Sequence, residues 1–178
     1  MTMRRVEVIP YDPAWAETFA READEIAGVF GPEALAIHHI GSTSIPNLCA
    51  KPIVDVLVEV RDIERVDDFN AEMAGRGYQP KGEFGIPGRR FFIKGGDATR
   101  THHVHVFQAG HPDVERHLNF RDYLIEHPAE ARAYGRLKEE LAQRFPEDIE
   151  GSMAGKDRLI KEMDRKAAAW GAGGAELT

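Results

Sequence analysis

The sequence of 178 residues predicts an α/β (α+β) fold, in which helices pack on a small mixed β-sheet and a helical segment follows. Residues 52–60 form a nearly continuous apolar, β-branched run, which is typical of a central strand covered on both faces. Residues 89–94 and 101–108 flank a Gly-Gly-Asp turn, which indicates an antiparallel pair. One crossover followed by such a pair gives a mixed sheet with helices on its faces.

The first elements are a helix and a strand. Asp12-Pro13 predicts a helix start, with Asp12 as the N-cap and Pro13 in the first turn. Apolar residues recur near helical spacing until about Phe30, where Gly31 ends the helix. A strand over 35–40 and a turn rich in Gly, Ser, Thr and Pro then lead into the central strand.

Helices account for most of the remaining chain. After Asp62, apolar residues recur at three- and four-residue steps, which predicts an amphipathic helix that ends near Gly75. The later helices are predicted over 113–126, 128–145 and about 155–170. We expect one domain over residues 1–170 and a disordered tail over 171–178, because that tail has little apolar surface to pack.

Composition limits the classes of function. Lys and Arg total 23 against 30 Asp and Glu, which gives a formal charge of −7 and disfavours nucleic acid as the main partner without excluding it. The single cysteine favours a reducing compartment, and no apolar run approaches the roughly 20 residues of a membrane span. We therefore expect a cytoplasmic protein that does not enter membranes.

Asp55 is the most informative residue, because a carboxylate on an apolar central strand needs a counter-charge or a metal. A structural ion pair and a functional site both satisfy this need. The turn at Gly41-Ser42 offers backbone N–H groups and a hydroxyl, which are suited to phosphate oxygens.

Four sequence blocks resemble the GrpB family, whose members have the nucleotidyltransferase superfamily fold. The blocks are His39–Pro46, Ala50–Val58, Arg89–Phe92 and His103–Phe107, and the likeness runs from about Val6 to Lys166. The resemblance implies that Gly41 and Ser42 hold phosphates, that Asp55 binds a divalent metal, and that Asp55 and Ser42 are the catalytic residues. The superfamily usually has a second acid two residues later, where this sequence has Leu57.

His103 and His105 offer a replacement for the missing acid. Residues two apart on a strand face the same way, so both imidazoles can converge with Asp55 on one ion, while His102 faces oppositely. The alternative is a histidine pair that only lines a cleft. The ion is Mg²⁺ by superfamily resemblance, and Zn²⁺ or Mn²⁺ if the two histidines are ligands.

Five cationic or hydrogen-bonding residues are candidates for binding the phosphorylated ligand. Arg89 and Arg90 suit phosphate oxygens, and neighbours on a strand point to opposite faces, so one of them is expected in the site. Lys51 can reach a phosphate or neutralise Asp55. Tyr134 and Lys138 resemble recurring family positions and share a helix face, although a Tyr at the core edge and a Lys in solvent would also fit.

Three functions follow from these residues. The first is a divalent-metal-dependent nucleotidyl or phosphoryl transferase that acts on an unidentified acceptor. The second is a non-catalytic module that binds a nucleotide or another phosphorylated small molecule related to coenzyme A, since GrpB-like domains also occur attached to dephospho-coenzyme A kinase. The third is a phosphoester hydrolase with a metal held by the histidines.

Overall fold

The structure, a computed structural model, describes residues 8–96, 99–144 and 149–174. The chain divides into two compact units. The sheet unit comprises Pro13–Ile40 and Ile53–Glu115, and the helical unit comprises Met1–Asp12, Gly41–Pro52 and Arg116–Thr178. The single domain expected over residues 1–170 stays a prediction.

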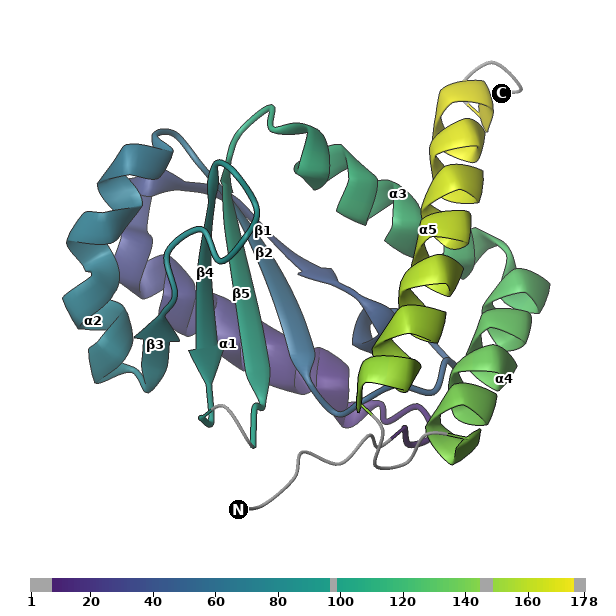
Figure 1. Ribbon diagram of the computed structural model, residues 1–178. Coiled ribbons are helices and arrows are strands. Elements are labelled where there is room, and N and C mark those ends of the chain that lie inside the picture. Colours follow the sequence, from purple (N-terminus) through teal and green to yellow (C-terminus); the bar gives the residue numbers. More distant parts are fainter. Residues whose placement is uncertain (1–7, 97–98, 145–148, 175–178) are drawn as a thin grey trace. The chain divides into compact units, whose positions relative to one another are not determined.

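The sheet unit contains five strands in the order β1-β2-β5-β4-β3 (Figure 1). Their bounds are β1 (Ala34–Ile40), β2 (Val54–Val60), β3 (Tyr78–Pro80), β4 (Arg89–Lys94) and β5 (His102–Gln108). Strand β2 is antiparallel to β1 and parallel to β5, and β4 is antiparallel to both of its neighbours. This arrangement confirms the predicted mixed sheet and the antiparallel pair.

Helix α1 (Ala14–Phe30) packs across one face of this sheet (Figure 1). Alternation along the central strands places fully buried valines on that face, among them Val56, Val58 and Val104. The helix ends at Gly31, whose φ of 54° suits glycine. The N-cap position is Pro13, one residue after the predicted Asp12, and the Pro13 carbonyl accepts a hydrogen bond from Ala16 N–H.

The segment after Asp62 is a 3-10 helix over Ile63–Phe69, followed by the short α2 (Asn70–Gly75), rather than one α-helix. Its apolar residues explain the difference. Ile63, Val66 and Phe69 are spaced by three, the repeat of a 3-10 helix, and only the last step to Met73 is four. The Asp62 carboxylate accepts a hydrogen bond from Glu64 N–H and holds the first turn.

A polar network lies on the α1 side of the sheet. Glu22 of α1 is 8% exposed, and its Oε1 accepts hydrogen bonds from the Tyr78 hydroxyl and the Lys94 ammonium, both at 2.8 Å. Burial raises the pKa of Glu22, but these two donors and the nearby His102 outweigh it, so the pKa lies below its ordinary value. The network ties α1 to β3, β4 and β5.

Replacing Tyr78 with Phe removes one donor to the buried Glu22 carboxylate. We expect Tyr78→Phe to lower the free energy of unfolding by about 1.5–3 kcal/mol, the usual contribution of a hydrogen bond to a charged group. Tyr123→Phe is the matched control, because Tyr123 is also buried and its hydroxyl makes no hydrogen bond within the described part of the chain. Urea unfolding of both variants measures the difference, and equal losses would contradict this role of Tyr78.

The helical unit contains most of α3 together with α4 and α5. The bounds are α3 (Pro112–Glu126), α4 (Pro128–Arg144) and α5 (Ile149–Gly174). Their core includes Leu48, Leu124 and Met163. Helix α5 begins earlier and ends later than predicted, and four residues of the expected tail belong to it, while 175–178 lie outside the described residues. Among the described residues, no helix is both long and apolar enough to cross a membrane.

Candidate functional site: an aspartate with two histidines, and a buried lysine on a serine

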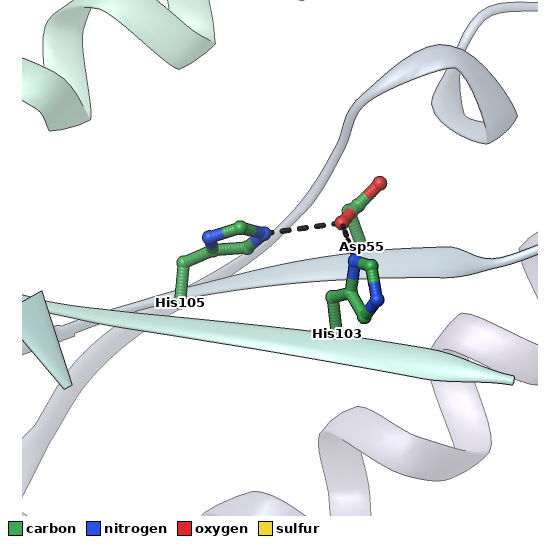
Figure 2. Close-up of side chains that lie close together, drawn as sticks. All are labelled: Asp55, His103 and His105. Carbon is green, nitrogen blue, oxygen red and sulfur yellow. Dashed lines mark hydrogen bonds and ion pairs between the residues drawn. The ribbon is translucent and has the colours of Figure 1, made fainter. Parts of the chain in front are cut away.

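Asp55, His103 and His105 converge on the face of the sheet opposite α1 (Figure 2). In the parallel pairing of β2 and β5, Asp55 is opposite His103 and Leu57 is opposite His105. One carboxylate oxygen, Asp55 Oδ1, lies 3.4 Å from His103 Nδ1 and 3.1 Å from His105 Nε2. The strand of the two histidines therefore lies beside the strand of Asp55, as their predicted convergence requires.

The two imidazoles keep Asp55 ionised. Burial favours the neutral acid, but hydrogen bonds and charges from His103 and His105 outweigh it and hold the pKa of Asp55 well below its usual range. The Asp55 side chain is 25% exposed, so the carboxylate can still meet a ligand. Burial lowers the pKa of His105 despite the attraction of Asp55, which favours its neutral form near neutral pH.

Arg89 fixes the position of the His105 proton. The Arg89 side chain is buried, and its NH1 lies 3.3 Å from His105 Nδ1. Because a guanidinium can only donate, Nδ1 accepts and the single ring proton of neutral His105 sits on Nε2, from which it is donated to Asp55 Oδ1. The order Arg89, His105, Asp55 is therefore a directed chain of hydrogen bonds.

The lowered pKa of His105 makes stability depend on pH. An imidazole whose pKa is lower when folded binds its proton more tightly in the unfolded chain, so acidification through its ordinary value of 6.5 destabilises the fold. We expect the urea concentration at the unfolding midpoint to decrease as the pH is lowered from 7.5 to 5. The decrease should be smaller in His105→Gln, whose amide can both donate to Asp55 and accept from Arg89. An identical pH profile for the two proteins would contradict the assignment.

Three further polar residues near the cluster have partners of their own. Arg90 points away from Asp55 and pairs with Asp67 at 2.8 Å, so Arg89 is the arginine of the pair that meets the cluster, as strand alternation predicts. His102 also lies on the opposite face, where its Nε2 is 3.8 Å from Glu22 Oε2. Glu59, on the face of Asp55, is paired with His38 at 2.6 Å.

The cluster has the chemistry of a metal site. Ligands about 2.1 Å from a tetrahedral Zn²⁺ are roughly 3.4 Å apart. The distances from Asp55 Oδ1 to the two histidine nitrogens are close to that value, and the three ligand atoms lie within 4.8 Å of one another. Two imidazoles and one carboxylate suit Zn²⁺, whereas Mg²⁺ prefers oxygen ligands. The donor set therefore fits Zn²⁺ better than the Mg²⁺ that the superfamily resemblance implies.

The hydrogen bonds of His105 and His103 limit how an ion can bind to them. An ion on His105 Nε2 would displace the proton given to Asp55 and leave the ring proton on Nδ1, facing the donors of Arg89. Metal binding at His105 and the Arg89–His105 hydrogen bond therefore exclude each other. His103 Nε2 is buried and makes no hydrogen bond among the residues that the structure describes, while Nδ1 is the ring nitrogen that faces Asp55.

The helical unit contains a second polar cluster, built on the predicted phosphate turn. Gly41, with a φ of 74°, begins a tight turn in which Ser44 N–H donates to the Gly41 carbonyl. Lys138 of α4 donates to Ser42 Oγ at 2.8 Å and to the Cys49 carbonyl at 3.1 Å. Its ammonium also lies 5.3 Å from the centre of the Tyr134 ring. The turn, Tyr134 and Lys138 thus come together.

Lys138 is only 4% exposed, so the alternative of a solvent-facing lysine was wrong. Burial raises the pKa of Tyr134 above its ordinary value, although a hydrogen bond with Ser42 lowers it, so the phenol stays protonated. Lys51 is partly buried in the segment that follows the turn, and its role stays a prediction. Ile40, the residue before Gly41, pairs with Asp55 in the sheet.

Sequence reasoning missed one aromatic neighbour of the cluster. Phe91 pairs with His105 across β4 and β5, and its ring centre lies 5.3 Å from His103 and 5.1 Å from His105. Strand alternation could have indicated it, because Phe91 is two residues from Arg89 and shares its face.

Comparison with known proteins identifies the family. The model of the GrpB protein family matches residues 5–166. The UPF0157 protein YqkA of Bacillus subtilis is 54% identical over 94% of this chain and 48% of its own length, so the chain spans about half of that relative. The crystal structure of conserved protein GrpB from Enterococcus faecalis is 47% identical, with a TM-score of 0.86 over 90% of this chain and 96% of that one.

More distant proteins share the fold or part of the sequence. The Cid1 poly(U) polymerase structure has a TM-score of 0.52 at 12% identity, over 77% of this chain and 43% of its own, which shows the fold alone. A dephospho-CoA kinase of Mycolicibacterium paratuberculosis is 25% identical over 93% of this chain and 46% of its own length. The chain therefore belongs to the GrpB family and has the nucleotidyltransferase type of fold.

Proposed function

We propose that the protein is a divalent-metal-dependent nucleotidyl or phosphoryl transferase. The observation that carries the proposal is the convergence of two imidazoles on the one carboxylate of Asp55. Asp55, His103 and His105 would hold the ion, which supplies a Lewis acid toward a phosphoryl oxygen when bound. With a single carboxylate and two nitrogen ligands, we infer that this ion is Zn²⁺ rather than Mg²⁺.

The Ser42–Lys138 pair of the helical unit is a separate candidate for binding phosphates. Lys138 donates to the partly buried Ser42 hydroxyl at the start of a glycine turn, and its positive charge attracts phosphate oxygens. The Tyr134 hydroxyl stays protonated and hydrogen-bonds Ser42, so it helps to hold the serine in place. These residues bind and orient phosphates, and the acceptor of the transfer is left open.

A binding module without turnover is the second candidate function. Leu57 occupies the position where the superfamily usually has a second acid, and it is fully buried. The likeness to a dephospho-CoA kinase over most of this chain suggests a ligand that resembles coenzyme A. A hydrolase would instead use the same ion and pass the phosphoryl group to water.

The test combines binding with product analysis. The wild-type protein is titrated with each nucleoside triphosphate, coenzyme A and inorganic triphosphate, with Zn²⁺, Mn²⁺, Mg²⁺ or chelator, and the melting temperature is followed. A ligand at 100 times its Kd stabilises the fold by about 2.7 kcal/mol. We expect Zn²⁺-dependent stabilisation by a triphosphate and release of pyrophosphate or phosphate with a suitable acceptor. Stabilisation without product supports the binding module, and no stabilisation by any phosphate contradicts both.

A further inference from the structure

Phe84 stands in an unusual backbone conformation beside the Asp55 cluster. It lies in the loop between β3 and β4 and has a φ of +49°. A bulky side chain rarely adopts this left-handed conformation, which is costly unless the surrounding structure imposes it. Glycine would avoid the cost at this position.

The loop is held in place by several hydrogen bonds. Arg89 Nε and NH2 donate to the carbonyls of Glu83 and Phe84 at 3.1 and 2.8 Å. Phe91 N–H donates to the Gly82 carbonyl at 2.8 Å. The Phe84 backbone is therefore fixed by the same arginine that donates to His105.

This fixed backbone presents an aromatic ring to solvent. Phe84 is 53% exposed, and its ring stacks on Phe91 with centres 5.3 Å apart and planes inclined by 19°. Because Phe91 covers one face of the ring, the exposed half is the opposite face. A strained backbone that exposes a large apolar ring does not serve stability, which indicates that the ring serves binding.

The stack connects the exposed ring with the polar cluster. Phe91 contacts Phe84 and both His103 and His105, at ring spacings of 5.1 to 5.3 Å. The exposed ring of Phe84 is therefore linked through one ring to the imidazoles that converge on Asp55. A ribose with one phosphate can bridge such a separation.

We propose that Phe84 is the stacking platform for the nucleobase of the ligand, whose phosphate end lies toward His103 and His105. That the stacked group is a nucleobase rests on the proposed function. A π-face accepts every base, so the platform contributes affinity with little base specificity. Removal of the ring weakens nucleotide binding by about 5- to 150-fold, the range that one base–aromatic stack gives.

The test uses substitutions that separate the ring from the loop. Phe84→Gly removes the ring and suits the positive φ, so its melting temperature should not fall. Phe84→Trp keeps a stacking face and adds a fluorophore. Leu35→Ala removes another exposed apolar side chain of the sheet unit, 50% exposed, and is the matched control. Each protein is titrated with AMP, adenosine, uridine and ribose 5-phosphate.

The proposal expects that adenosine and uridine quench Phe84→Trp fluorescence beyond the wild-type change, and that ribose 5-phosphate does not. It also expects weaker AMP binding in Phe84→Gly and wild-type binding in Leu35→Ala. Unchanged AMP affinity in Phe84→Gly, or no quenching by nucleosides, overturns it. Nucleoside quenching is measured without phosphate or metal, so its failure is distinct from failure of the proposed transferase, which inorganic triphosphate and Zn²⁺ test.

Discussion

Asp55→Asn is expected to abolish zinc binding while leaving the protein folded. Asn keeps the shape of the side chain and can accept from His105 Nε2, but it lacks the charge that the ion requires. The carboxylate oxygen lies between both histidine nitrogens, at 3.1 and 3.4 Å, so its loss removes the shared ligand. We expect the affinity for Zn²⁺ to fall by at least about 100-fold, beyond the 10- to 100-fold effect of outer-shell partners.

Glu59→Gln is the matched control for this substitution. Glu59 lies on the same strand and face as Asp55 but is paired with His38, so the Zn²⁺ affinity of the Glu59→Gln protein should equal that of the wild type. Competition with a fluorescent chelator measures the affinity of both variants, and circular dichroism checks that they fold. If Asp55→Asn keeps the wild-type affinity for Zn²⁺, the carboxylate is a structural partner of the histidines and the metal assignment is wrong.

Lys138→Met is expected to weaken binding of inorganic triphosphate by about 10- to 150-fold, the equivalent of a charged hydrogen bond of about 1.5–3 kcal/mol. Met keeps an unbranched apolar stem in the buried position but removes the ammonium that reaches Ser42 Oγ. Isothermal titration with triphosphate measures the effect. Lys138→Arg keeps the charge and should lose less.

Lys161→Met provides the comparison for the lysine substitution. Lys161 lies on α5 and is exposed, so removal of its charge tests the general effect of net charge on anion binding. Equal triphosphate affinity in Lys138→Met and Lys161→Met, with both proteins folded, would show that Lys138 only supports the Gly41 turn and the Cys49 carbonyl.

Strand periodicity predicted the sheet and much of the site. It placed His103 and His105 on one face and His102 on the other, and it expected only one of Arg89 and Arg90 in the site, because alternate side chains of a strand point in opposite directions. The predicted convergence of both histidines with Asp55 requires β2 and β5 to be neighbours, and the register shows that they are.

The remaining features depend on contacts that a local pattern does not contain. Lys138 and Ser42 are 96 residues apart, and nothing in a helix periodicity predicts that a lysine will be buried on a distant hydroxyl. Phe84 has a positive φ in a loop that Arg89 holds in place. From composition alone, such a φ would be expected at a glycine. Strand β3 has only three residues and includes Pro80, so its strand signal is weak.

The central claim is that Asp55, His103 and His105 hold the ion of a phosphate-binding protein. Anomalous diffraction at the zinc edge, from crystals grown with Zn²⁺ and a non-hydrolysable nucleoside triphosphate, tests it most directly. The account predicts one zinc peak about 2.1 Å from Asp55 Oδ1, His103 Nδ1 and His105 Nε2. A zinc peak elsewhere, or no zinc peak on these three residues, would contradict it.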